Sequence, residues 1–400
     1  LREWLNVHRM SRGALWSVLV LFSARFLLVL PASQIISAYR TTGNMARTTW
    51  AWNWISLLTH LLVLLALWWS GSPVVVAAMY PLALALGSGV VIVDLWNART
   101  GFLPVPTRGH WALLVPMLPA AIQFSAISIA SFMTLHGSLL VVSYSLGAVA
   151  VAQFSVVRTV SNVPQQVTRL IIAALWPEIT LLGSRGTDNR LARLHYAVSG
   201  IAICLSAAVG GWLWFAGDFV VGIWTSGQVP VQPGLLHILI AYSVLAATWQ
   251  TSCIFSLALN RHRTFAVSLL LSSTVGLLGA VALVSSLQLP GVVASLIAAE
   301  ALFGYYPIQR SACEASGAST GTFIPWLWRG VCMVCVVSLG LNWLVFRVCD
   351  ARSITGIVGA AAVTVPAVAW FGWIAWLPRD VRAEIVVKAR WLSLARRRRM

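Results

Sequence analysis

Five polar residues between positions 155 and 169 have a spacing that places them on one side of a helix. They follow one another at intervals of three, four, three and four positions: Ser155, Arg158, Asn162, Gln165 and Arg169. Residues at these intervals share one face of an α-helix. On an ideal helix, eleven positions separate the two arginines by about 16 Å along the axis and by ~20° around it. The spacing therefore predicts a polar, cationic face on a single helix.

This face favours the binding of an anion. An arginine side chain keeps its charge at any physiological pH, and its planar guanidinium group can hold phosphate or pyrophosphate oxygens in a bidentate manner. Pro164 lies in the middle of the face, where it removes one backbone hydrogen bond and should bend the helix. We therefore expect a substrate-binding face of five polar residues with a hinge at Pro164.

A second interpretation of the same residues remains open, in which they only hydrogen-bond to neighbouring helices and hold them together. This interpretation accounts for Asn162 and Gln165. It accounts less well for the two arginines, because the whole chain has 10 Asp and Glu residues against 27 Lys and Arg residues.

The elements that carry these side chains belong to a membrane protein. The sequence is 59% hydrophobic and only 9% charged, whereas about 25% of the residues of a soluble domain are charged. Apolar segments long enough to cross ~30 Å of hydrocarbon recur along the chain. Their frequent Gly, Pro, Ser and Thr residues favour packed, bent helices over a barrel. The predicted fold is an all-α polytopic membrane bundle with about eleven spans: 14–31, 50–70, 73–95, 111–134, 146–182, 194–216, 234–258, 264–286, 290–308, 323–346 and 354–377.

The net charge of +17 is concentrated in every second connection between these spans. Four of the five intervening connections, near residues 71, 136, 218–232 and 288, contain no Lys or Arg, whereas the fifth contains Arg347 and Arg352, partly offset by Asp350. This alternation predicts that the basic loops and the C-terminus are cytoplasmic, and it disfavours nucleic acid as the partner. The basic segment 379–400 is expected either to lie as a helix on anionic membrane lipids or to form a disordered stop signal.

Other charged residues also fall within or near the spans. Asp94 and Glu178 lie near span ends and are expected at the membrane interface, and Arg329 is expected to extend to the inner surface. Arg25 and Glu300 lie deeper and have opposite charges, so an ion pair between them is one option. On physical grounds Arg25 is also a candidate ligand residue, because a charge within a span usually faces a cavity or a partner.

Cysteine spacing gives no sign of a metal site. Cys332 and Cys335 form a CxxC pattern, but it lies in the unbroken apolar run "GVCMVCVVSLG" without a second pair of ligands. We interpret it as a buried pair that binds no metal. No catalytic residues and no cofactor are predicted.

Several runs between residues 110 and 195 resemble a known family. They are "LLVPMLPAAIQF", "GSLLVVSYSLGAVAVAQFSVVRTVSNVPQQVTRLIIAALWPEITLL" and "RGTDNRLARLH". They resemble the seventh and eighth spans and the following loop of O-antigen-type polysaccharide flippases, in the multidrug/oligosaccharidyl-lipid/polysaccharide exporter superfamily. The matching residues are Pro119, Leu146, Gly147, Phe154, Arg158, Pro164, Pro177, Asp188, Arg190 and Leu191.

The resemblance implies a MATE-like, two-lobed exporter fold of fourteen spans, of which this chain would hold spans four to fourteen. The implied domains are a partial N-terminal lobe (1–110), a C-terminal six-helix lobe (111–312), two extra spans (320–378) and the basic tail (379–400). Three missing spans also agree with the charge alternation. Eleven spans and a cytoplasmic C-terminus would place residue 1 outside, although residues 1–12 are basic.

The implied function is the transport of an undecaprenyl-pyrophosphate-linked oligosaccharide across the bacterial cytoplasmic membrane, for the biosynthesis of polysaccharides such as the O-antigen of lipopolysaccharide. Glycosyltransferases and a polysaccharide polymerase are the implied partners. In related peptidoglycan-precursor flippases, an arginine at the position of Arg158 is thought to contact the pyrophosphate, and the resemblance implies the same contact here.

Two other functions remain open. A cation-coupled multidrug extruder of the same superfamily would be expected to use intramembrane carboxylates, and the spans contain fewer carboxylates than arginines. A membrane enzyme of polysaccharide assembly, such as a polymerase or a ligase, generally needs a long outer loop or a carboxylate–metal site, and the sequence indicates neither. We therefore expect a transporter, not an enzyme.

Overall fold

The computed structural model describes residues 11–41, 45–97, 111–184, 189–348, 353–378 and 382. The chain divides into two compact units, residues 1–111 and 112–400. The predicted all-α membrane bundle is confirmed, because ten helical stretches in the described part of the chain are long and apolar enough to cross a membrane. The predicted basic tail lies outside the described residues, apart from Arg382.

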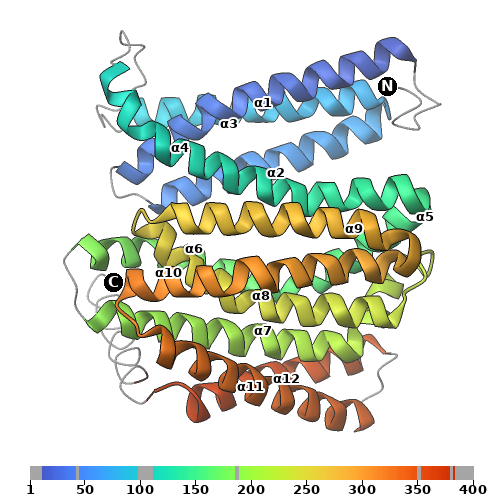
Figure 1. Ribbon diagram of the computed structural model, residues 1–400. Coiled ribbons are helices and arrows are strands. Elements are labelled where there is room, and N and C mark those ends of the chain that lie inside the picture. Colours follow the sequence, from blue (N-terminus) through green and yellow to red (C-terminus); the bar gives the residue numbers. More distant parts are fainter. Residues whose placement is uncertain are drawn as a thin grey trace, which may run out of the picture. The chain divides into compact units, whose positions relative to one another are not determined.

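Unit 1 contains three long helices. They are α1 (Arg12–Thr41), α2 (Met45–Trp69) and α3 (Pro73–Asn97). Helix α3 packs against both α1 and α2 (Figure 1). The core of the unit joins Leu84 of α3 to Ile36 of α1 and Ile55 of α2. A Cβ atom at Gly87 would overlap the side chain of Ile55, so this glycine lets α2 and α3 approach closely, as small residues do between membrane helices.

The tryptophans of α2 lie at both ends of an apolar helix. Trp50 and Trp54 near its start are 63% and 60% exposed, and Trp68 and Trp69 at its end are 88% and 94% exposed. Eighteen residues separate Trp50 from Trp68, or about 27 Å of helix. This distance is close to the ~30 Å thickness of a bilayer's hydrocarbon core, and tryptophan is enriched at both of its boundaries. The pattern supports a membrane-spanning α2.

Unit 2 is built around α7 (Asn189–Trp224), which packs against α6, α8, α11 and α12. The other elements of the unit are α4 (Trp111–Phe132), the π-helix η1 (Met133–Gly137), α5 (Ser138–Ser161), α6 (Val163–Ser184), α8 (Pro233–Ala258), α9 (His262–Ala299), the π-helix η2 (Glu300–Tyr305), α10 (Tyr306–Ser316), α11 (Thr320–Val348) and α12 (Ile354–Ala375). Figure 1 shows α7 between α8 on one side and α11 and α12 on the other. Small residues permit this central position, since a Cβ on Gly210 would lie 2.6 Å from Val244, and one on Gly211 would overlap Ser338.

Helix α5 reverses its direction at Gly147. The backbone of Gly147 has φ 83° and ψ −178°, a conformation that side-chain-bearing residues adopt only at considerable energetic cost. Arg158, eleven residues after Gly147, donates a hydrogen bond to the carbonyl of Leu135, twelve residues before it. In a straight helix, residues this far apart in sequence would be separated by more than 30 Å. Residues 133–146, which include η1, and residues 148–161 are therefore the two antiparallel arms of a hairpin.

A second reversal divides α9 at Gln288, where φ is 52° and ψ is −140°. Across this turn, the hydroxyl of Ser295 donates to the carbonyl of Gly276 at 3.1 Å. Backbone hydrogen bonds continue on both sides of Asn162, to Arg158 and from Gln166, so α6 extends the second arm of α5. When the hairpin arms are separated and α6 is joined to α5, the described helices make eleven passes.

One predicted connection, near residue 136, is wrong. His136, Gly137 and Ser138 form no loop, because the helix continues there as η1 and α5. The hydroxyl of Ser138 donates to the carbonyl of Thr134 at 2.7 Å, which satisfies a backbone acceptor that would need water in a loop. The chain turns eleven residues beyond 136, at Gly147.

The prediction that Cys332 and Cys335 form a buried pair is also wrong for one member. Cys332 is exposed on α11, and Cys335 is half-buried. Their helix is apolar on all sides, so its hydrophobicity could not distinguish a side facing protein from a side facing lipid.

A Gly147→Ala substitution should destabilise the protein by about 1–3 kcal/mol, because alanine is strained in this backbone conformation. No side chain would collide with the added methyl group, so the effect would be purely conformational. Thermal unfolding of the purified protein, followed by loss of the monodisperse peak in size-exclusion chromatography, measures the change. Gly340→Ala is the matched control, because Gly340 lies in α11 with equally open surroundings and no positive φ. Equal melting temperatures for the two variants would contradict a turn that requires glycine.

Candidate functional site

The hairpin of α5 positions Arg158 against the π-helix η1. One guanidinium nitrogen, Nη1, donates to the hydroxyl of Ser138 at 3.0 Å, and Nη2 donates to the carbonyl of Leu135 at 2.8 Å. The guanidinium carbon lies 5.2 Å from the centre of the Phe154 ring. A π-helix changes the helical register locally and often occurs at functional sites. Here it contributes a backbone acceptor to the arginine.

All the described partners of Arg158 are neutral. No carboxylate pairs with it among the residues that the structure describes. A charged residue within a membrane span normally faces a partner or a water-filled cavity, because the uncompensated charge is costly in hydrocarbon. Arg158 is only half-buried, so its remaining donors can reach an anion.

Arg169 belongs to a second part of the polar face, on α6. Its Nη2 atom donates to Oε1 of Gln165 at 3.2 Å, and the same oxygen accepts from Nε2 of Gln250 at 3.1 Å. Gln165 is buried, whereas Arg169 is exposed. The buried Oε1 atom of Gln250 has no hydrogen-bond partner in the described part of the chain. This amide network therefore retains hydrogen-bonding capacity.

The junction of α5 and α6, which lies between the two arginines, is hydrogen-bonded to α7. Asn162 separates α5 from α6, and Pro164 follows two residues later. The carbonyl of Pro164 accepts from the hydroxyl of Ser206 at 3.0 Å, and Ser206 also shares a hydrogen bond with Thr168 at 2.7 Å. These contacts would have to break or move if the chain hinged here, and the hinge role of Pro164 remains a prediction.

A carboxylate lies near this polar face. Glu300, the first residue of η2, accepts hydrogen bonds from the hydroxyl of Tyr242 at 2.5 Å and from the indole nitrogen of Trp249. Trp249 precedes Gln250 on α8, and Gln250 donates to Gln165. The same part of α8 therefore contacts both Glu300 and the amide network beside Arg169. The sequence identified Glu300 as deeply placed, but Tyr242 and Trp249 had no pattern that could have marked them.

The structure places the remaining predicted residues as follows. Ser155 and Asn162 are half-buried on the second arm of the hairpin and at its end. Arg25 lies in unit 1, where its guanidinium carbon is 4.7 Å from the ring centre of Tyr80, beside a cavity of about 400 Å³ that His60 and Thr59 also line. Arg25 and Glu300 each have partners within their own unit, and the proposed ion pair between them remains untested.

No described group of three or more His, Cys, Asp or Glu residues could hold a metal ion. Comparison with protein-family models, curated proteins and solved structures finds no match for this chain. The resemblance to polysaccharide flippases therefore remains an expectation.

If the polar face lines a water-filled cavity, cysteines at positions 155 and 162 should react with a membrane-impermeant maleimide. The test uses a background in which the six native cysteines are replaced by alanine, with labelling detected by a mass shift. Thr251→Cys is the control, because Thr251 is fully buried between helices. Equal protection of all three cysteines from the maleimide would favour the interpretation that the polar residues only hold helices together.

Proposed function

We propose that the chain is a membrane transporter that moves an undecaprenyl-pyrophosphate-linked oligosaccharide across the bacterial cytoplasmic membrane for polysaccharide biosynthesis. The observation that carries the proposal is the charge of Arg158, which lies in a membrane-spanning hairpin and is held by a hydroxyl, a carbonyl and an aromatic ring. An anion that enters the bundle would supply the missing negative charge.

A lipid-linked pyrophosphate has the chemistry that this arrangement favours. Its polyprenyl chain stays in hydrocarbon, while its two phosphates need cationic, hydrogen-bonding partners. Arg158 offers a guanidinium group held by hydrogen bonds, and Arg169 offers an exposed one on the adjoining helix α6. The unpartnered Oε1 atom of Gln250, in the amide network beside Arg169, can accept a hydrogen bond from a sugar hydroxyl.

The rest of the proposal follows from the resemblance and the charge alternation. The helices form a MATE-like exporter in the cytoplasmic membrane with the basic loops and the C-terminus in the cytoplasm. Glycosyltransferases supply the lipid-linked oligosaccharide on the inner leaflet, and a polysaccharide polymerase uses it on the outer leaflet.

Replacing Arg158 by alanine should slow transport about 10- to 100-fold, because hydrogen bonds to a charged group contribute about 1.5–3 kcal/mol. Arg158→Lys should give an intermediate rate, since an ammonium keeps the charge but loses the planar fork. The measurement uses proteoliposomes containing a polyprenyl-pyrophosphate-linked disaccharide, and it follows the fraction accessible to an enzyme added outside.

Arg310→Ala is the matched control for loss of one positive charge. Arg310 is exposed and pairs with Glu314 at 2.8 Å, away from the hairpin of α5. The Arg310→Ala protein should transport the lipid at the rate of the unmodified protein. Unchanged transport by Arg158→Ala, with normal insertion and folding, would refute the proposed role of Arg158.

One observation favours the second candidate function, a cation-coupled multidrug extruder. Glu300 is a carboxylate within a membrane span, and its described hydrogen-bond partners are Tyr242 and Trp249, so it could exchange its partners for a proton or another cation. In that case the protein should confer resistance to cationic dyes, and Glu300→Gln should abolish the resistance. Lipid transport that persists in Glu300→Gln, without any dye resistance in the unmodified protein, would favour the flippase.

A further inference from the structure

An open groove runs along unit 1 between α2 and α3, far in sequence from the hairpin of α5. Its volume is about 470 Å³. Its walls are apolar, with Trp50, Trp54, Leu58 and Leu61 from α2 and Val90 and Val91 from α3. Tyr39, Arg47 and Asp94 form the polar end of the groove. The groove therefore has apolar walls and a polar end, which match the apolar and polar parts of an amphiphilic ligand.

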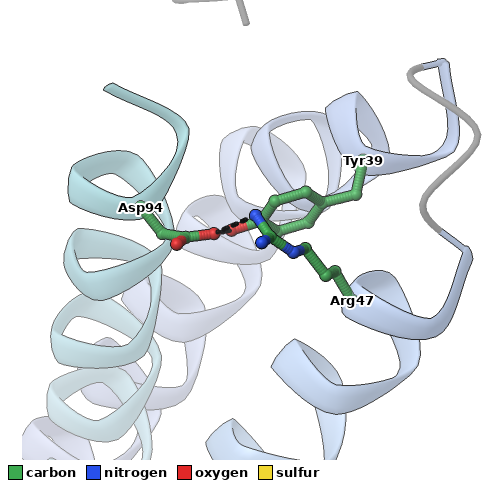
Figure 2. A network of polar contacts seen from close by, with 3 residues as sticks. All are labelled: Tyr39, Arg47 and Asp94. Carbon is green, nitrogen blue, oxygen red and sulfur yellow. Dashed lines mark hydrogen bonds and ion pairs between the residues drawn. The ribbon is translucent and has the colours of Figure 1, made fainter. Parts of the chain in front are cut away.

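The polar end of the groove contains one positive side chain and one negative side chain, and a tyrosine hydroxyl contacts the negative one. The hydroxyl of Tyr39 donates to Oδ2 of Asp94, and Nη1 of Arg47 lies 3.2 Å from the same oxygen (Figure 2). The side chains of Arg47 and Asp94 are 54% and 47% exposed. No other described group bonds to Oδ1 of Asp94 or to the remaining nitrogens of Arg47. Both charged groups thus retain hydrogen-bonding capacity on their open sides.

We propose that this groove binds a glycerophospholipid with a zwitterionic, primary-amine headgroup of the ethanolamine type. The lipid phosphate accepts from Arg47, and the ammonium group donates to Asp94. A trimethylammonium group has no N–H donor, so a choline headgroup loses the second contact. A glycerol headgroup has no positive charge for Asp94, so an anionic lipid meets uncompensated repulsion there.

The length of the groove fits the acyl part of such a lipid. Fourteen residues separate Arg47 from Leu61 along α2, or about 21 Å of helix. This exceeds the ~15 Å depth of one leaflet, half of the bilayer's hydrocarbon core. Trp50 and Trp54 lie next to the polar end, at the level where tryptophan meets headgroups. An acyl chain against Leu58 and Val90 would complete the occupancy.

The test is native mass spectrometry of the full chain, purified in detergent and mixed with equimolar ethanolamine, choline and glycerol phospholipids of identical acyl chains. The ethanolamine lipid should be retained about fivefold over the others, the scale of one partly exposed ion pair. Equal retention of the three lipids would overturn the proposal, as would preference for the anionic lipid.

Two variants separate the headgroup contacts from the groove itself. Asp94→Asn should lower retention of the ethanolamine lipid to that of the choline lipid, and Val90→Trp should lower retention of all three by filling the groove. Glu314→Gln is the matched control, because it removes the half-exposed partner of an arginine in unit 2, and it should leave the preference unchanged.

An Asp94→Asn protein that keeps the ethanolamine preference would show that the Arg47–Asp94 pair only joins helices. Because Val90→Trp leaves the pair intact, it tests the groove even if Asp94→Asn fails to fold. The lipid measurement needs no transport activity, so its result is independent of the function proposed for Arg158.

Discussion

Hydrocarbon offers a polypeptide no hydrogen-bond partners, so the backbone N–H and C=O groups of a membrane-spanning segment have to bond within the protein. The backbone satisfies this requirement by forming helices. Hydroxyl side chains follow the same rule, since Thr59, Thr159 and Thr364 each donate to the carbonyl four residues earlier in their own helix. Glycines at helix contacts allow close packing, and those of α7 let it take a central place in unit 2.

The same requirement explains how the chain can reverse its direction without a long loop. At Gly147 and Gln288 the backbone turns within a single residue that has a positive φ. The two hairpins then bind their own arms together, through Arg158 to Leu135 in one case and Ser295 to Gly276 in the other. The π-helices η1 and η2 lie on arms of these hairpins, and they position Leu135 and Glu300 respectively. The positions of these polar groups in unit 2 thus depend on where the helices fold back.

Charge is handled differently in the two units. In unit 1, Arg47 is neutralised by Asp94, which leaves a site without net charge that suits a zwitterion. In unit 2, the described partners of Arg158 and Arg169 are neutral oxygens and an aromatic ring, which leaves a site that suits an anion. The units differ because Asp94, at the end of α3, pairs with Arg47. In unit 2, the oxygens of Glu300 already accept hydrogen bonds from Tyr242 and Trp249.

The sequence by itself determined the fold class, because the length and spacing of apolar segments reflect the thickness of a bilayer directly. It also indicated the polar residues from Ser155 to Arg169, because helical spacing is a local property, and their role as one binding face stays a prediction. It misplaced the turn near residue 136, since Gly and Ser can continue a membrane helix when hydroxyls return to the backbone. It misjudged Cys332, since an apolar helix gives no sign of which side faces lipid. Only the tertiary structure decided which groups surround each charge. Leu135 and Ser138 reach Arg158, and Tyr242 and Trp249 reach Glu300, across 20 to 58 positions of sequence. These contacts depend on how helices fold back and pack, which no local pattern of residues records.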